Sequence, residues 1–307
     1  MATKPFFPRI KRWAYRTGNL NADAKFAREA KMSSLSTTWA RIMAPLAGGD
    51  VDAGVLEAAA TLARPFGAEV AGVYAPADVA DLMPWMGEGF MGGVQVTAVQ
   101  SLKDAAAEGE KAARAIFDSN PYGRKTFTPL TSPVWSALAM EGRLSDVVVF
   151  DDATAKGRGP LAETFQQIVA DEQRPTLVAR PGLKVDGCVA VAWDGGKEAS
   201  RAMRTALPLL QKAARVVILA APASSARYFD PARLQSFLDD RDIKSEVHTI
   251  SETGEPAPLL LAAAKTVMAD ILVVGAFGHP RLQEFIFGGA TRTFLNAAAA
   301  PSLFLSH

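Results

Sequence analysis

Short apolar runs alternate with longer alanine-rich segments along most of the chain. The run 271–274 is rich in β-branched residues and ends at a glycine, which is typical of a strand buried on both faces of a parallel sheet. The pattern predicts strands near residues 188–193, 215–221, 244–250, 270–275 and 302–306, and helices near residues 198–213, 231–240, 256–268 and 289–299. This alternation indicates βαβ units with right-handed crossovers, and therefore an α/β fold with a doubly wound, mostly parallel sheet.

The same landmarks occur twice, in the same order. An apolar strand ends at the glycine pair 48–49 in the first half and at 195–196 in the second, and the next strand ends at Ala-Pro at positions 75–76 and 221–222. Each half closes with Pro, a small residue and Leu, at 175–177 and 301–303. The chain is therefore interpreted as a tandem duplication. We expect two domains of similar plan, at residues 39–183 and 184–307.

The first half departs from this plan in two places. It contains a Gly- and Met-rich insertion at 76–93, and its third crossover is shortened to about 133–142. The insertion is apolar, so it is either a lid or partner surface, or a segment that packs over the first domain. Its G-x-G-x-x-G pattern at 87–92 follows no strand, and we interpret it as a loop.

The first 38 residues differ from the rest of the chain. Residues 1–31 carry eight Lys or Arg against only Asp23 and Glu29, and they lack the continuous apolar stretch of a secretory signal. We expect a flexible basic extension; contact with an anionic membrane or with nucleic acid is the alternative.

Composition bounds the class of protein. The chain has 307 residues, of which 49% are hydrophobic and 21% charged, and its formal net charge is +1. That balance is typical of a globular protein with about two domains and gives no electrostatic reason to expect nucleic acid as a partner. Cys188 is the only cysteine and is expected to be an inert buried thiol. Because no apolar run reaches the ~18 residues of a membrane span, we expect no membrane insertion and a cytoplasmic location.

Glycines mark the most informative stretch. Gly275 and Gly278 follow the strand 270–275, and Gly288 and Gly289 open the predicted helix 289–299. A glycine turn next to a helix N-terminus gathers free N–H groups and the positive end of the helix dipole, which favours an anion such as phosphate. The alternative is that these glycines serve only tight turns and close helix packing.

The spacing G-x2-G-x9-G resembles the nucleotide-binding signature of the universal stress protein family, and the resemblance covers nearly all of residues 39–307. It implies five-stranded sheets of the adenine nucleotide alpha hydrolase-like fold, often paired through the last strand. In that family a Ser or Thr usually follows the third glycine, but here Gly289 takes its place, and Thr291 matches another common hydroxyl position. The resemblance implies ATP, with Mg²⁺, or a related adenine nucleotide, held by Ala192, Asp194, Ala221, Gly275, Gly278, Gly288, Gly289, Ala290 and Thr291.

The two halves differ at these positions. Ala47 stands where the second half has Asp194, and two carboxylates, Asp151 and Asp152, stand where it has Gly275 and Ala276. Because like charges beside a phosphate site cost free energy, we expect a nucleotide in the second half only. Arg281 and Arg292 are candidates to neutralise phosphate, and His279 is a candidate hydrogen-bonding group.

Other chemistry finds little support in the sequence. It contains no P-loop and no G-x-S-x-G elbow, and its three histidines are too scattered for a metal triad or a catalytic base with its orienting partner. We therefore expect a binding protein more than an enzyme, with no metal site of its own. Two alternatives stay open: an interaction protein with a vestigial site, and a slow ATP-hydrolysing enzyme. Pairing of the two halves within the chain is expected, and a homodimer is plausible from the family.

Overall fold

The computed structural model describes residues 38–77, 92–131, 133–220, 230–251, 254–275, 289–298 and 300–307, without the side chains of 92–96 and 290. The predicted extension 1–38, apart from its last residue, and most of the insertion 76–93 lie outside these residues. The chain divides into two units, 1–37 and 38–307.

The first half contains β1 (Arg41–Leu46), α2 (Asp52–Ala63), a 3-10 turn η1 (Arg64–Phe66), β2 (Glu69–Tyr74), α3 (Gly92–Ser119), β3 (Lys125–Pro129), α4 (Val134–Arg143), β4 (Val147–Asp151), α5 (Asp152–Ala155), α6 (Ala162–Ala170) and β5 (Thr176–Ala179). The second half contains β6 (Cys188–Trp193), α7 (Lys197–Thr205), α8 (Leu207–Lys212), β7 (Arg215–Ala220), α9 (Pro231–Asp239), β8 (Ser245–Thr249), α10 (Pro256–Thr266), β9 (Ile271–Gly275), α11 (Gly289–Asn296) and β10 (Ser302–Ser306).

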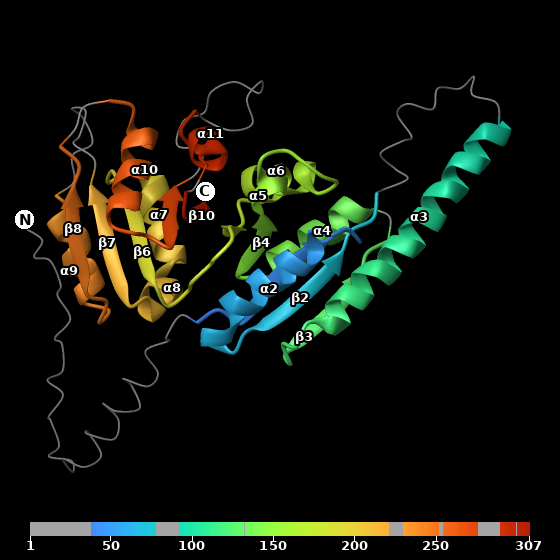
Figure 1. Cartoon of the computed structure of the whole chain (residues 1–307), viewed down its shortest axis with the longest axis horizontal. Helices are drawn as coiled ribbons and strands as arrows, with labels where there is room; N and C mark the ends of the chain where they lie inside the picture. Colours follow the sequence, from blue (N-terminus) through green and yellow to red (C-terminus); the bar gives the residue numbers. More distant parts are fainter. Residues whose placement is uncertain are drawn as a thin grey trace, which may run out of the picture. The chain divides into compact units, whose positions relative to one another are not determined.

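The strands form one ten-stranded sheet in the order β3-β2-β1-β4-β5-β10-β9-β6-β7-β8, drawn in Figure 1. Each half has the same internal order, and within each half all pairs are parallel. The halves join where β5 and β10 pair antiparallel, with Phe304 opposite Leu177. The expected α/β fold with doubly wound parallel sheets is confirmed, and the two halves pair within the chain.

Helices cover both faces of the sheet, and two apolar cores result. One core packs α2, the C-terminal part of α3, α7, α8 and α9 against one face. The other packs α4, α6, α10 and α11 against the opposite face. Each core runs through both halves: in the first, Trp39 stacks on Phe304 with ring centroids 5.7 Å apart. The inner strands are mostly apolar because both of their faces are buried, whereas the edge strands β3 and β8 are polar and partly exposed.

One helix prediction is wrong because of a proline. The expected helix 198–213 is divided into α7 and α8 at Ala206, two residues before Pro208. Pro208 has no N–H group to donate within a helix, and in a continuous helix its ring would clash with the carbonyl of the residue four positions earlier. The helix α7 therefore ends, and a new helix begins. The helix expected at 289–299 ends earlier, at Asn296.

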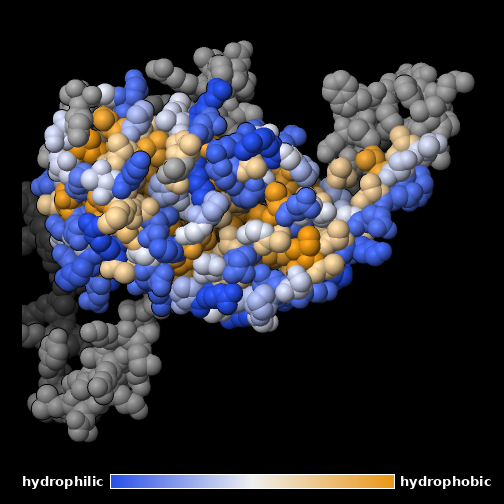
Figure 2. All heavy atoms as spheres, in the orientation of Figure 1, coloured by the Kyte–Doolittle hydropathy of each residue, from blue (hydrophilic) through white to orange (hydrophobic). Residues whose placement is uncertain are grey.

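The 28-residue helix α3 runs from the end of the insertion to β3. In Figure 2, hydrophilic residues line its outer side at the right of the view. Its inner side approaches β1 and β2 closely, because a Cβ on Gly109 would lie 2.3 Å from the Tyr74 hydroxyl oxygen and a Cβ on Gly48 would lie 2.5 Å from the Gly109 carbonyl oxygen. The α3 helix therefore covers the carboxyl ends of β1 and β2.

Two further expectations concern the membrane and the cysteine. None of the helices in the described part of the chain is long and apolar enough to cross a membrane. Cys188 is half-buried at the start of β6. Burial raises the pKa of its thiol, which keeps it protonated and unreactive at neutral pH.

Candidate functional site

The order of the strands reverses between β6 and β9. The chain passes from β6 to its neighbour β7 on one side, whereas β9 pairs with β6 on the other, with Val191 opposite Val273. Open α/β sheets bind ligands at the carboxyl ends of the strands at such a point. The predicted site residues Ala192 and Asp194 at the end of β6 and Gly275 at the end of β9 meet at this edge of the sheet.

Asp194 shapes the turn between β6 and α7. It is exposed, and its Oδ1 accepts a hydrogen bond of 2.7 Å from the Gly196 backbone N–H. Gly195 adopts a left-handed conformation with φ of 73°, which glycine reaches without steric cost. The turn ends at Gly196, which caps α7. One carboxylate oxygen of Asp194 is thus engaged locally, and the side chain remains accessible to solvent.

Gly275 has a packing role. A Cβ at this position would lie 2.6 Å from the Glu198 carbonyl carbon and 2.7 Å from the Ala199 backbone nitrogen. The first turn of α7 therefore occupies the space in which a side chain at 275 would stand. At this position the requirement for glycine is explained by close helix packing, as one of the two interpretations of the sequence proposed.

The start of α11 is open by contrast. Gly289 is exposed, and a Cβ built on it would meet no atom of the described residues within 4 Å. The first N–H groups of a helix have no acceptor within the helix, so this end can receive an anion. Thr291 is only 5% exposed and lies on the core side of α11 with Phe294 and Leu295, which belong to the apolar core.

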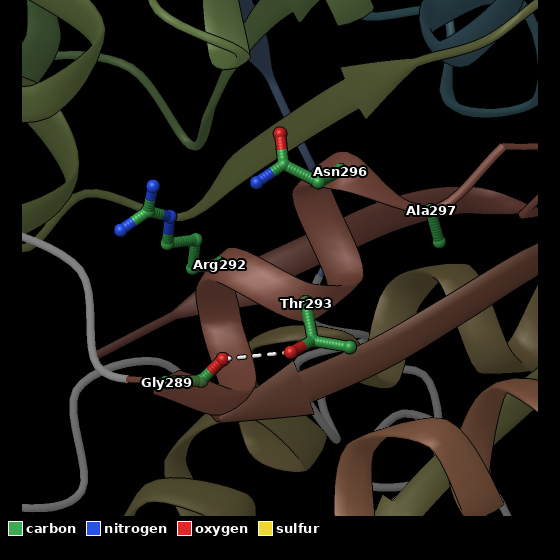
Figure 3. Close-up of a pocket in the computed structure, with 5 residues that line it drawn as sticks. All are labelled: Gly289, Arg292, Thr293, Asn296 and Ala297. Carbon is green, nitrogen blue, oxygen red and sulfur yellow. Dashed lines mark hydrogen bonds between the residues drawn. The ribbon is translucent and has the colours of Figure 1, made fainter.

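A hollow of about 420 Å³ lies along the opposite side of α11, and the described residues that line it are Gly289, Arg292, Thr293, Asn296 and Ala297. Figure 3 shows the side chains of Arg292 and Asn296 projecting from the helix, while the Thr293 hydroxyl donates a 2.9 Å hydrogen bond to the Gly289 carbonyl. Arg292, a candidate to neutralise phosphate, is thus exposed within one turn of Gly289. The helix α11 thus brings Arg292 close to Gly289 at its N-terminal end.

Several predicted groups lie outside the described residues: Ala221, Gly278, Gly288, His279 and Arg281, together with the side chain of Ala290. The loop that carries the middle of the glycine signature is therefore still a prediction. Among the residues that the structure does describe, no three His, Cys, Asp or Glu side chains gather as ligands for a metal ion.

The corresponding edge of the first half is filled by its own side chains. The fully buried Asp52 carboxylate accepts hydrogen bonds from the backbone N–H groups of Ala47 at 3.0 Å and Gly48 at 2.8 Å. Burial raises the pKa of Asp52, although these backbone hydrogen bonds act in the opposite direction. An internal carboxylate thus engages N–H groups at the end of β1, and α3 lies over the same edge.

Asp151 and Asp152, which replace the glycine positions, also have internal partners. Asp151 caps α5 by accepting hydrogen bonds from the backbone N–H groups of Ala153 at 2.7 Å and Thr154 at 3.0 Å. Asp152 forms ion pairs with Lys156 and Arg180. The residues expected to repel phosphate in the first half serve instead as a helix cap and as one partner in an ion-pair network.

Two residues that contact elements of the candidate site were not among those predicted from the sequence. Glu198, in the first turn of α7, has a side chain only 12% exposed and pairs with Lys197 at 3.4 Å. Arg180, directly after β5, is 9% exposed and reaches into the second half. A signal existed for Glu198, because it follows a glycine pair at a helix start. Arg180 could have been noticed as a charged residue adjoining an apolar strand, but its partners in the second half lie more than a hundred residues away along the chain.

Comparison with known proteins agrees with this architecture. The model of the Universal stress protein family matches residues 188–305, and no curated protein matches the chain. A solved universal stress protein from Archaeoglobus fulgidus has a TM-score of 0.59 and 14% identity, over 87% of this chain and 95% of that one. A candidate universal stress protein from Pseudomonas aeruginosa has a TM-score of 0.50 and 13% identity, over 87% of this chain and 93% of that one. At these identities the likeness to the solved structures is one of fold.

A further solved structure is of a universal stress protein in complex with cAMP. It has 12% identity and a TM-score of 0.28, over 47% of this chain and 98% of that one. A likeness at this level carries no argument about the present chain.

Proposed function

We propose that the second half of the chain, whose residues 188–305 match the model of the Universal stress protein family, binds an adenine nucleotide, ATP with its Mg²⁺ ion or a close relative. The family match over residues 188–305 carries this proposal. The arrangement at the carboxyl edge supports it, because the exposed Asp194 and the open start of α11 belong to the one half that keeps the glycine spacing.

Each part of a nucleotide has a chemical counterpart in this half. The N–H groups at the start of α11 and the guanidinium of Arg292 suit phosphate oxygens. The Asp194 carboxylate can accept hydrogen bonds from the ribose hydroxyls or from the amino group of the base. The metal ion would arrive with the nucleotide. We assign binding and no hydrolysis to this site, and we propose the cytoplasm as its location.

A second candidate function is an interaction protein with a vestigial site. Two observations favour it: Gly275 is accounted for by the packing of α7, and Gly289 replaces the hydroxyl residue usual in the family. A binding measurement separates this candidate from the first.

The test is calorimetric titration of the full chain with Mg-ATP. We expect one site per chain, with affinity reduced at least about tenfold, or ~1.4 kcal/mol, in Asp194→Ala and in Gly278→Asp, which puts a carboxylate in the predicted phosphate loop. Asp186→Ala is the matched control, since Asp186 is exposed and precedes β6 at the opposite edge of the sheet. A folded wild-type protein that binds no ATP would leave the interaction protein as the better account.

A further inference from the structure

The Arg180 side chain joins the two halves of the chain. It is 7% exposed, and it donates hydrogen bonds to one carboxylate and three backbone carbonyls. Its Nε lies 2.8 Å from Asp152 Oδ1, and its Nη1 lies 2.7 Å from the Pro301 carbonyl oxygen. Its Nη2 lies 3.0 Å from the carbonyl oxygens of both Phe294 and Leu295. The planar guanidinium can satisfy such a set because its donors are fixed in a fork.

The carbonyls of Phe294 and Leu295 belong to the last turn of α11. Carbonyls at the end of a helix have no N–H partner within it, and the helix dipole places partial negative charge there. A buried guanidinium at this point therefore satisfies two orphan acceptors and complements the dipole. The other end of α11 is Gly289, about 12 Å away for eight residues at 1.5 Å each. The proposed phosphate site begins there.

The carboxylate that holds Arg180 comes from the first half. Asp152 begins α5 directly after β4, the position at which the second half has Ala276, next to Gly275. Asp152 is also paired with Lys156, so its orientation is fixed from two sides. The residue that replaces the glycine signature in the first half thereby supports, through Arg180, the helix of the second half.

We propose that Arg180 is a positioning residue for the nucleotide site: by fixing the C-terminal end of α11 against the first half, it holds the N-terminal turn of that helix in place for phosphate. This inference rests on the proposed function. It also assigns a role to the first half, which supplies the anchor of the helix while binding no nucleotide itself.

Arg180 should matter for binding of the phosphates and not for binding of the nucleoside. Because α11 is proposed to face the phosphates and Asp194 the nucleoside, loosening α11 weakens ATP binding and leaves adenosine binding nearly unchanged. In Arg180→Met we expect ATP affinity to fall at least tenfold and adenosine affinity to change less than threefold. Arg180→Lys keeps the charge without the fork, and we expect an intermediate loss. Asp152→Asn keeps Arg180 but removes its anionic partner, and the loss of ATP affinity should have the same sign.

The experiment combines titration of the full chain with Mg-ATP and with adenosine, and hydrogen exchange of the ligand-free protein. We expect faster amide exchange in α11 of Arg180→Met and unchanged exchange in α7. Arg158→Met is the control, since Arg158 is an exposed arginine of the first half. If Arg180→Met does not fold, Arg180→Lys and Asp152→Asn decide the matter.

Three results would overturn the inference: unchanged ATP affinity in the folded Arg180 and Asp152 variants, equal losses for ATP and adenosine, or α11 exchange as slow as in the wild type. Failure of the wild type to bind ATP would instead refute the proposed function. The positioning of α11 by Arg180 would then be judged by exchange alone, with faster exchange in the variants supporting it.

Discussion

At the scale of single residues, the same amino acid serves different ends in the two halves and even within one motif. Gly275 is required because α7 packs against it, whereas a Cβ on Gly289 would meet no atom of the described residues within 4 Å. In the first half, a buried aspartate at position 52 binds the backbone N–H groups of Ala47 and Gly48. These roles depend on what lies across the fold from each residue, so residue type and spacing alone do not reveal them.

The packing role of Gly275 leads to a prediction. In Gly275→Ala the new methyl group meets the backbone of α7, which cannot rotate away as a side chain would, so the protein should lose about 1–3 kcal/mol of unfolding free energy. Gly54→Ala is the control: Gly54 lies in α2 with nothing within 4 Å, and alanine there should add roughly 0.5–1 kcal/mol. Denaturant titrations measure both. Equal stability of Gly275→Ala and the wild type would show that α7 does not fill this space.

The sequence predicted the candidate site unevenly. The strand ends, the exposed Asp194 and the helix start at Gly289 follow from local pattern, and the structure brings these elements to one edge of the sheet. Thr291 lies on the core side of α11, which a spacing of two residues after a glycine could not reveal. The anchoring of α11 by Arg180 needed the pairing of β5 with β10, a contact between distant parts of the chain.

At the scale of elements, hydrophobic periodicity located the second-half strands to within one residue at each end. It placed a single helix at 198–213, where Pro208 divides the segment into two. Pro208 is visible in the sequence, so this error was avoidable. The placement of α3 was not predictable, because it depends on how Gly109 of α3 fits against Gly48, which follows β1, and Tyr74, which ends β2.

That fit can be tested by a double-mutant cycle. Gly109→Ala should destabilise the protein, because the new methyl group would stand 2.3 Å from a Tyr74 hydroxyl that is held by a 2.9 Å hydrogen bond to the Ala106 carbonyl. In a Tyr74→Phe background that oxygen is absent, and the higher helix propensity of alanine, worth ~1 kcal/mol, should dominate. We expect a coupling free energy of roughly 1–3 kcal/mol from chemical denaturation. The same effect of Gly109→Ala in both backgrounds would contradict the packing of α3 over the edge of the first half.

At the scale of the whole described unit, two halves of the same strand order share one sheet and two continuous cores. Their carboxyl edges differ in chemistry. Asp52, Asp151 and Asp152 are bound to internal partners in the first half, whereas Asp194 and the start of α11 are accessible in the second. We propose that this difference decides which half binds the nucleotide.

The most direct test of this claim is photolabelling of the full chain with an azido-adenine analogue of ATP, followed by peptide mapping. Excess unlabelled ATP should suppress specific labelling and serves as the control. We predict that the suppressible label falls within residues 188–298, on peptides from the ends of β6 or β9 or from the start of α11. Suppressible label on peptides within residues 41–179 would place the nucleotide in the first half and contradict the account.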